Sequence, residues 1–375
     1  MREIVIIAND VVPGMAGPVA APGLRAWGLA QGLRSHGYKP LVAVDARVAK
    51  NAWPGSVPSP TPPGTMPLPP AQFGDLIRTR RPAAVIMTNS NHIDSLNDLA
   101  GVPLIYDFFA PKVLELAEQA DPSTRAGELA RLEARKLRGL QASSAVIING
   151  AKKVGYVERW LDRANNSHVP KAVVNMPLET TPSKAPGTGP VRIVVSGYLQ
   201  PWSNPGPWAE AVRPFLSTRQ VVLHLLIAKH WGGAGARAVL PKMFRDLGSS
   251  SNVRLHGLMD FLDFRRLLAD CHVSLDLFSR NPERELAFVT RTAVAISCGL
   301  AAVHVPFTEV SDLIERDDAG WLVDGEDVDA IHKVLQEAIE QQELLAQKRA
   351  GARIMSGRLE PHEAVSPMVD LLEGL

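Results

Sequence analysis

The sequence has few cysteines, no long apolar run and no excess of either charge. Cys271 and Cys298 are the only cysteines among 375 residues, so a disulfide scaffold and a CxxC metal site are excluded. There are 40 lysines and arginines and 39 aspartates and glutamates, a balance that argues against a protein that coats nucleic acid. The longest apolar runs have the length of a strand. We therefore expect no transmembrane segment.

The first ten residues do not resemble a signal peptide. Arg2 and Glu3 precede a short apolar run that ends at Asn9 and Asp10, without a small-residue cleavage pattern. The expectation is therefore a cytoplasmic protein. Peripheral contact with the inner membrane face is left open, although no amphipathic segment rich in lysine and arginine supports it.

Several motifs with well-understood chemistry are missing. Neither GxGxxG nor GxxxxGK[ST] occurs, so a dinucleotide fingerprint and a P-loop lack support. A hydrolase triad lacks support as well, since there is no GxSxG sequence. The histidines are scattered without HxxxH or HExxH spacing. We expect neither a metal site nor a cofactor.

The sequence does contain a regular alternation of short β-branched runs with longer amphipathic stretches. This alternation predicts right-handed βαβ units, and hence an α/β fold with two Rossmann-like, doubly wound parallel-sheet domains that face a cleft. Helices are expected at 24–35, 123–140, 236–247, 260–269, 290–297 and 327–347. Strands are expected at 3–8, 41–44, 83–88, 102–107, 145–148, 191–196, 221–227, 253–256, 273–277 and 301–305.

Two proline-rich stretches interrupt this alternation. Residues 54–70 contain eight prolines and are expected to form a surface loop. Residues 177–190 lack any periodicity and end just before a new strand, as a linker between domains would. We therefore expect one domain at 1–180, a second at 190–355, and a C-terminal helix at 356–375 that packs back on the first domain.

Ligands of open parallel sheets bind at the carboxyl ends of the strands. In the first half, Gly17 lies in a glycine-containing loop before a helix that carries Arg25. The loop could bring backbone N–H groups close to a phosphate, or its glycines could merely satisfy the geometry of a turn. Asp107 ends the fourth strand, where it could accept a hydrogen bond from a sugar hydroxyl or cap the following helix.

In the second half, residues 283–299 are the most informative segment. Glu283 and Glu285 follow a strand, Thr290 begins a helix, and Arg291 lies in its first turn. A cation there is unfavourable for the helix dipole unless it shares a bound anion such as a diphosphate. The alternative is a solvated arginine.

Two further charged residues follow strands of the second half. Glu309 could bind a hydroxyl-bearing ligand or form the acidic first turn of a helix. Lys229 could pair with a phosphate or be solvated.

Four stretches, taken in order, resemble the two-Rossmann (GT-B) nucleotide-sugar glycosyltransferases, in particular the retaining, family 4-like bacterial enzymes. The resemblance covers most of the chain, and each motif is weak alone. The stretches are GPVAAPGLRAWGLAQGLRSHGY at 17–38, VPLIYD at 102–107, SGYLQPWSNP at 196–205 and AFVTRTAVAISCGL at 287–300, the last followed by Glu309 and GWLV at 320–323.

The resemblance implies metal-independent transfer of a sugar from a nucleoside diphosphate sugar, which is a co-substrate. The acceptor, a small molecule, glycolipid or glycan, would lie on the first domain and the donor mainly on the second. The residues implied in donor binding are Gly17, Arg25, Gly197, Lys229, Thr290, Arg291 and Glu309. Those implied in catalysis are Asp107, Glu283 and Glu285.

The sequence also departs from the family pattern. Val294 stands where many members have a glutamate that holds the donor ribose, and the loop after Gly197 lacks their arginine and lysine. Asp107 stands near the position of a histidine of the first domain. A non-catalytic GT-B subunit or scaffold is therefore the alternative. Another two-Rossmann enzyme, such as a nucleotide-sugar epimerase, is a third hypothesis.

Overall fold

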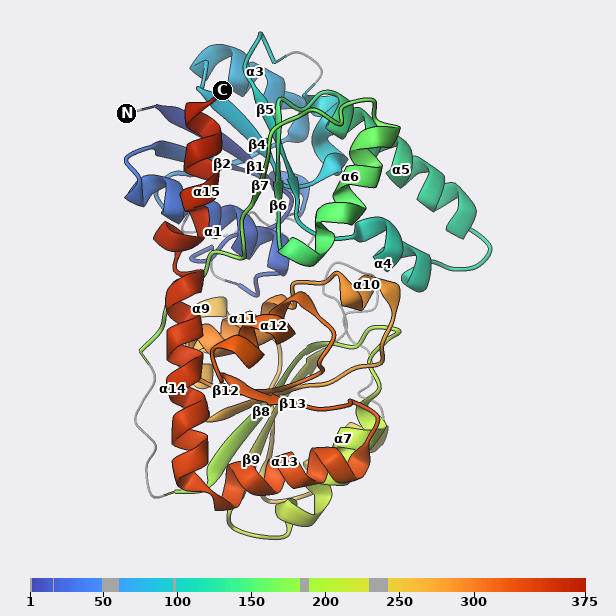
Figure 1. Cartoon of the computed structure of the whole chain (residues 1–375), viewed down its shortest axis with the longest axis vertical. Coiled ribbons are helices and arrows are strands. Elements are labelled where there is room, and N and C mark those ends of the chain that lie inside the picture. Colours follow the sequence, from blue (N-terminus) through green and yellow to red (C-terminus); the bar gives the residue numbers. More distant parts are fainter. Residues whose placement is uncertain (1, 16, 49–60, 97–98, 183–188, 229–241) are drawn as a thin grey trace. The chain divides into compact units, whose positions relative to one another are not determined.

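The computed structural model describes residues 2–15, 17–48, 61–96, 99–182, 189–228 and 242–375. They form two compact units. Unit 1 comprises Met1–Leu178, Leu286–Phe288 and Leu359–Leu375, and unit 2 comprises Glu179–Glu285 and Val289–Arg358. Each unit holds one parallel sheet with helices around it (Figure 1). The predicted α/β class with two doubly wound parallel sheets is confirmed.

Unit 1 contains a seven-stranded sheet in the order β3-β2-β1-β4-β5-β6-β7, and its paired strands run parallel. The strands are β1 (Glu3–Ala8), β2 (Lys39–Asp45), β3 (Thr65–Leu68), β4 (Ala84–Met87), β5 (Leu104–Phe108), β6 (Ala145–Ile148) and β7 (Lys171–Val173). The α-helices are α1 (Ala21–Ser35), α3 (Phe73–Arg80), α4 (Lys112–Gln119), α5 (Arg125–Gln141), α6 (Val154–Arg163) and α15 (Pro361–Glu373). Three short 3₁₀ helices are η1 (Pro70–Gln72), η2 (Ser90–Ser95) and η3 (Ala151–Lys153).

Strand β1 is apolar because helices cover both faces of the sheet. Ile4 and Ile6 belong to a core to which α1 and α15 contribute, whereas Val5 and Ile7 belong to a core with α3, α5 and α6. Successive side chains of a strand point to opposite faces, so a strand buried on both faces needs a continuous apolar run. This is why the sequence signal for β1 is strong.

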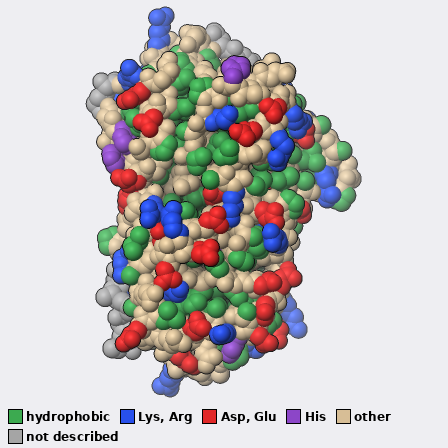
Figure 2. Space-filling model, in the orientation of Figure 1, with side chains coloured by type: hydrophobic (Ala, Val, Ile, Leu, Met, Phe, Trp, Pro, Cys, Tyr) green, Lys and Arg blue, Asp and Glu red, His purple; other side chains and the backbone are tan. Residues whose placement is uncertain are grey.

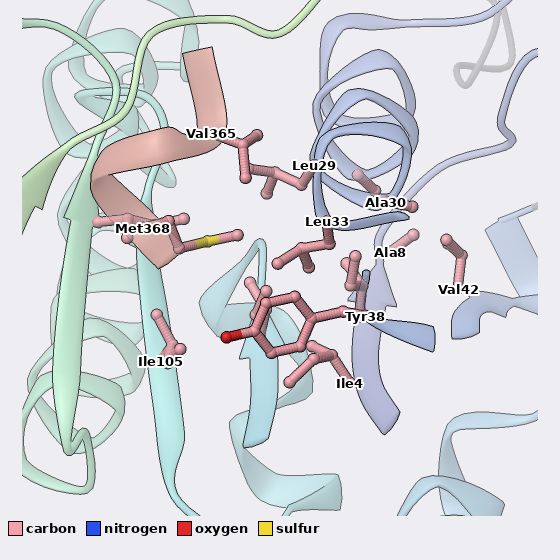
Figure 3. Close-up of a cluster of buried hydrophobic side chains, with 14 of the residues drawn as sticks. Ile4, Ala8, Leu29, Ala30, Leu33, Tyr38, Val42, Ile105, Val365 and Met368 are labelled. Atoms are coloured by element: carbon pink, nitrogen blue, oxygen red, sulfur yellow. The ribbon is translucent and has the colours of Figure 1, made fainter. Parts of the chain in front are cut away.

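The C-terminal helix α15 packs against α1 within unit 1. Figure 3 shows Val365 of α15 beside Leu29 and Leu33 of α1, in one buried cluster. A glycine in α1 permits this close approach, since a Cβ at Gly32 would lie 2.3 Å from the backbone oxygen of Pro361. Helix α15 therefore helps to close one face of the sheet of unit 1.

Unit 2 contains a six-stranded parallel sheet in the order β10-β9-β8-β11-β12-β13. Its strands are β8 (Val191–Tyr198), β9 (Val221–Ala228), β10 (Val253–Leu255), β11 (Val273–Asp276), β12 (Ala301–His304) and β13 (Gly320–Leu322). The helices are α7 (Pro205–Leu216), α8 (Lys242–Gly248), α9 (Phe261–Ala269), α10 (Pro282–Glu285), α11 (Thr290–Ser297), α12 (Glu309–Arg316), α13 (Val328–Glu340) and α14 (Gln342–Leu359).

Some elements differ from the sequence-based expectation. The proline-rich stretch 54–70 includes the edge strand β3, where proline is tolerated because one side of the strand has no partner. The three-residue strands β7 and β13 were not expected. The single helix expected at 327–347 is divided into α13 and α14 at Gln341, whose backbone is not helical. The first half of the helix expected at 236–247 lies outside the described residues, and the second half coincides with α8.

The strand order changes direction once in each sheet. In unit 1 this happens between β1 and β4, and in unit 2 between β8 and β11. At such a switch point the connections leave toward opposite faces, which opens a crevice at the carboxyl ends of the two strands. The ends of β1 and β4, and those of β8 and β11, are therefore where ligand sites are expected.

The surface and the helices agree with the composition. In Figure 2, basic and acidic side chains are interspersed over the face in view, as a formal net charge of +1 allows. Among the helices in the described ranges, none is both long and apolar enough to cross a bilayer.

Candidate functional site

A pocket opens at the switch point of unit 2, at the carboxyl ends of β8, β9 and β11. It encloses about 380 Å³ of empty volume, part of which is open to solvent. Trp208 of α7 and Phe244 of α8 contribute apolar walls, and among the described residues the charged ones that line the pocket are Asp276 and Arg291. Elsewhere in the described ranges, too, no group of three or more histidine, cysteine or acidic side chains is arranged to hold a metal.

Arg291 extends from the first turn of α11 over the end of β8. A Cβ placed on Gly197 would lie 2.7 Å from Nη1 and 3.2 Å from Cδ of Arg291, so a larger residue would force this side chain to move. Gly197 also has φ +115°, a backbone conformation that other residues rarely adopt. The structure therefore brings together two residues that the sequence had singled out 94 positions apart.

The anion beside Arg291 belongs to the protein itself. Asp276, the last residue of β11, accepts from Arg291 Nε at 2.7 Å through Oδ1 and from Thr292 Oγ1 at 2.5 Å through Oδ2. Burial raises the pKa of Asp276, but the Arg291 guanidinium, His304 and these hydrogen bonds outweigh it, so the net pKa is lowered. The carboxylate of Asp276 thus explains why a basic residue, Arg291, is tolerated in the first turn of α11.

His304 supports Asp276 from β12. Burial lowers the pKa of His304 to about 4, so the ring is neutral at neutral pH. The ring lies 2.9 Å through Nδ1 from the backbone oxygen of Asp276 and 3.0 Å through Nε2 from Thr308 Oγ1. A carbonyl oxygen can only accept, so Nδ1 carries the proton and Nε2 accepts from the Thr308 hydroxyl. Ser311 Oγ in turn accepts from the Thr308 N–H at 2.9 Å.

Helix α10 pairs both of its carboxylates with arginines. Glu283 is 2% exposed, and its Oε1 lies 2.7 Å from Nη2 of Arg284. Glu285 is more accessible, and its Oε1 lies 2.6 Å from Nε of Arg280. The Arg284 guanidinium also lies 4.5 Å from the centre of the Trp202 ring. Both predicted acidic residues therefore have a cationic partner in unit 2.

The remaining candidates of unit 2 have simpler surroundings. Thr290 is the first residue of α11, directly before Arg291. Glu309 is the first residue of α12 and is buried, and an acidic side chain at this position is favourable for the helix dipole. Glu309 thus lies in the acidic first turn of a helix, as one of the two alternatives for it required. Lys229 lies outside the described residues.

Arg25 and Asp107, the charged candidates of unit 1, are paired with each other inside the unit. Arg25 and Asp107 form a two-pronged ion pair with N–O distances of 2.9 and 3.0 Å, and both side chains are 0% exposed. Arg25 Nη1 also donates to the backbone oxygens of Val174 and Asn175 at 2.9 and 2.7 Å. Burial raises the pKa of Asp107 despite its partner. Gly17 is buried in the bend before α1.

Sequence reasoning missed three residues near the switch points. Asp276 and His304 were read as parts of strands, although a polar residue at the end of an apolar run was a usable signal. Asp10 follows β1 in unit 1, is 8% exposed, and its Oδ1 accepts from the Val11 N–H at 2.7 Å. Burial raises the pKa of Asp10 to about 7.

No family model and no curated protein matches the sequence, but solved structures match the fold. Sucrose-phosphate synthase from Thermosynechococcus elongatus has a TM-score of 0.72 at 13% identity, over 100% of this chain and 99% of that one. HepE from Anabaena, in complex with UDP and glucose, has a TM-score of 0.67 at 16% identity over 100% of both chains. WaaG, a glycosyltransferase involved in lipopolysaccharide biosynthesis, has a TM-score of 0.64 at 12% identity over 99% and 100%.

These similarities span the whole chain and include both units. Together with the two parallel sheets, they show that the chain has the GT-B fold. At identities of 12–16% they establish architecture alone.

Proposed function

We propose that the protein is a glycosyltransferase that takes its sugar from a nucleoside diphosphate donor, and that Arg291 binds the donor diphosphate. The observation that carries the proposal is the position of Arg291 over Gly197, at the mouth of the switch-point pocket of unit 2. The fold supports it, since similar structures include one with UDP and glucose and one with UDP-glucose.

The proposed chemistry is electrostatic. The Nη groups of Arg291 and the backbone N–H groups at the start of α11, beside Thr290, would stabilise the charge that develops on the leaving diphosphate. No metal is required for this. We propose transfer with retention to a hydroxyl of a small molecule, glycolipid or glycan, and Glu285 as the carboxylate most accessible to the donor sugar.

Calorimetry with UDP, GDP, dTDP and ADP tests the proposal. At least one should bind, and Arg291→Ala should weaken that binding roughly 10- to 100-fold, because a charge-assisted hydrogen bond contributes about 1.5–3 kcal/mol. Arg266→Ala is the matched control, since Arg266 is an exposed arginine of α9 that pairs with Asp263 of the same helix. Lack of binding by all four nucleotides, or an unchanged affinity in Arg291→Ala, would contradict the proposal.

A non-catalytic GT-B protein is the second candidate. The observation in its favour is that Arg291, Glu283 and Glu285 all have partners within the chain. Val294, where related enzymes have a ribose-binding glutamate, is 2% exposed and has no group to bind a diol. Nucleotide binding without hydrolysis or transfer of any UDP-, GDP-, dTDP- or ADP-sugar by the purified protein would favour this candidate.

A further inference from the structure

The pocket of unit 2 holds a carboxylate that the proposed function does not use. Asp276 contacts Arg291 through Nε at 2.7 Å, and the Arg291 side chain remains 26% exposed. A guanidinium has five N–H groups, of which Nε carries one and the two Nη atoms carry four. Asp276 therefore contacts Nε, the guanidinium nitrogen nearest the stem of the side chain, and leaves the two Nη nitrogens for another anion.

The direction of the Arg291 side chain is fixed from two sides. Gly197 lies beneath Nη1 and Cδ of Arg291, so the arginine side chain lies flat over the end of β8. Phe278 lies on another side, with its ring centre 5.9 Å from the guanidinium carbon. With Asp276 at Nε, the guanidinium has contacts that restrict its rotation as well as its position.

Asp276 is itself held in place by neighbours from two elements. Thr292 of α11 donates to Oδ2, and His304 of β12 donates to the backbone oxygen. His304 is fixed in turn by Thr308, at the start of α12. A buried carboxylate that is hydrogen-bonded on both oxygens is a rigid anchor, and it loses little entropy when it orients a partner.

We infer that Asp276 is a positioning residue for anion binding: it holds Arg291 so that the Nη groups of Arg291 face the phosphates of a nucleoside diphosphate. This inference rests on the proposed function. The opposite role is that Asp276 competes with the phosphates for Arg291. The two roles predict opposite effects on nucleotide affinity when the carboxylate is removed.

The first experiment compares the affinity for UDP, or for whichever nucleotide binds best, in Asp276→Ala and Asp276→Asn. Asparagine keeps an oxygen that accepts from Arg291 Nε, so its affinity should stay within threefold of the unmodified protein. Alanine removes the anchor and should weaken binding at least tenfold. Tighter binding in either variant would show competition and overturn the inference while leaving the proposed function intact.

The second experiment uses guanidinium ion as a replacement for the missing side chain. In Arg291→Ala, 20 mM guanidinium chloride should restore part of the lost nucleotide affinity, by about threefold or more relative to sodium chloride at the same ionic strength. In the double variant Arg291→Ala/Asp276→Ala, the ion should restore nothing. Equal rescue in both variants, or none in the single one, would overturn the inference.

Failure of the proposed function is recognised separately. If the unmodified protein binds no nucleoside diphosphate, both proposals fall together. Should Asp276→Ala not fold, as judged by near-UV circular dichroism, Thr292→Val takes its place, because it removes the hydrogen bond to Oδ2 and leaves the carboxylate. Its affinity should fall about threefold, and an affinity equal to or tighter than that of the unmodified protein would contradict the inference.

Discussion

The pairs Arg25–Asp107 of unit 1 and Arg291–Asp276 of unit 2 both lie at the carboxyl edge of a sheet, and they differ in what surrounds the guanidinium. In unit 1, Arg25 and Asp107 are both 0% exposed, and the arginine also donates to two backbone oxygens. In unit 2, Arg291 is 26% exposed and is held by Asp276 through Nε. The same two residue types thus form a closed structural pair in one unit and an open pair in the other.

The difference shows that pairing alone does not decide whether a charged residue is available to a ligand. A bidentate pair inside a protein uses both carboxylate oxygens and one full edge of the guanidinium, and it cannot open without stranding a charge. A pair made through Nε leaves the outer nitrogens accessible. The closed pair Arg25–Asp107 therefore fits a role in stability, and the open pair fits the proposed role of Arg291 in binding an anion.

The largest expected effect comes from breaking the closed pair. Arg25→Met leaves Asp107 uncompensated in the interior and should lower the free energy of unfolding by about 3–5 kcal/mol. Urea unfolding followed by circular dichroism measures this. Arg25→Met/Asp107→Leu should recover much of the loss, since it removes both charges. If Arg25→Met kept full stability but lost nucleotide binding, the assignment of this pair to structure would be wrong.

The next effect contrasts the two aspartates at the switch points. Burial raises the pKa of Asp10 in unit 1 to about 7, whereas the partners of Asp276 in unit 2 lower its pKa. Folded Asp10 keeps its proton while the unfolded chain has already lost it, so the protein loses stability as pH rises from about 4 to about 7. Asp276 has the opposite sign: it stabilises the fold at neutral pH, and this contribution is lost as pH falls below about 4.

The corresponding asparagine variants should therefore change stability in opposite directions at pH 8. Asp10→Asn should raise the free energy of unfolding by about 1–4 kcal/mol, and this gain should shrink toward pH 4. Asp276→Asn should lower it by about 1–3 kcal/mol. Urea titrations at pH 4, 6 and 8 provide the measurement. A loss of stability at pH 8 in Asp10→Asn would contradict a strained, buried carboxylate at this position.

Much of the fold could be predicted because its signal is local. The expected strands 3–8 and 145–148 coincide with β1 and β6, and the expected helix 290–297 coincides with α11. The three-residue strands β7 and β13 are too short to show a periodicity. Strand β3 lies in a proline-rich stretch, which predicts a loop. Their pairing comes from neighbours in the sheet, which the local sequence does not contain.

The site could be predicted only in part, for a similar reason. Residue type and position singled out Arg291, and the resemblance to the GT-B glycosyltransferases singled out Gly197. The pairing of Arg25 with Asp107, 82 positions apart, is a tertiary event that no spacing encodes. Asp276 was missed because it belongs to an apolar run that predicts a strand, and its partner Arg291 lies in the first turn of a later helix.

The smallest effect on stability is expected for substitution of Gly197, the glycine beneath Arg291. This substitution tests whether the open pair Arg291–Asp276 depends on that glycine. Gly197→Ala and Gly37→Ala both place a side chain at positive φ, at +115° and +84°, and each should cost about 1 kcal/mol of stability. A Cβ added at Gly37 would have no other atom within 4 Å, whereas a Cβ added at Gly197 would displace Arg291. Nucleotide affinity, measured by calorimetry, should therefore fall about tenfold in Gly197→Ala and stay unchanged in Gly37→Ala. Equal affinities in the two variants would mean that the position of Arg291 over β8 is not what binds the phosphates.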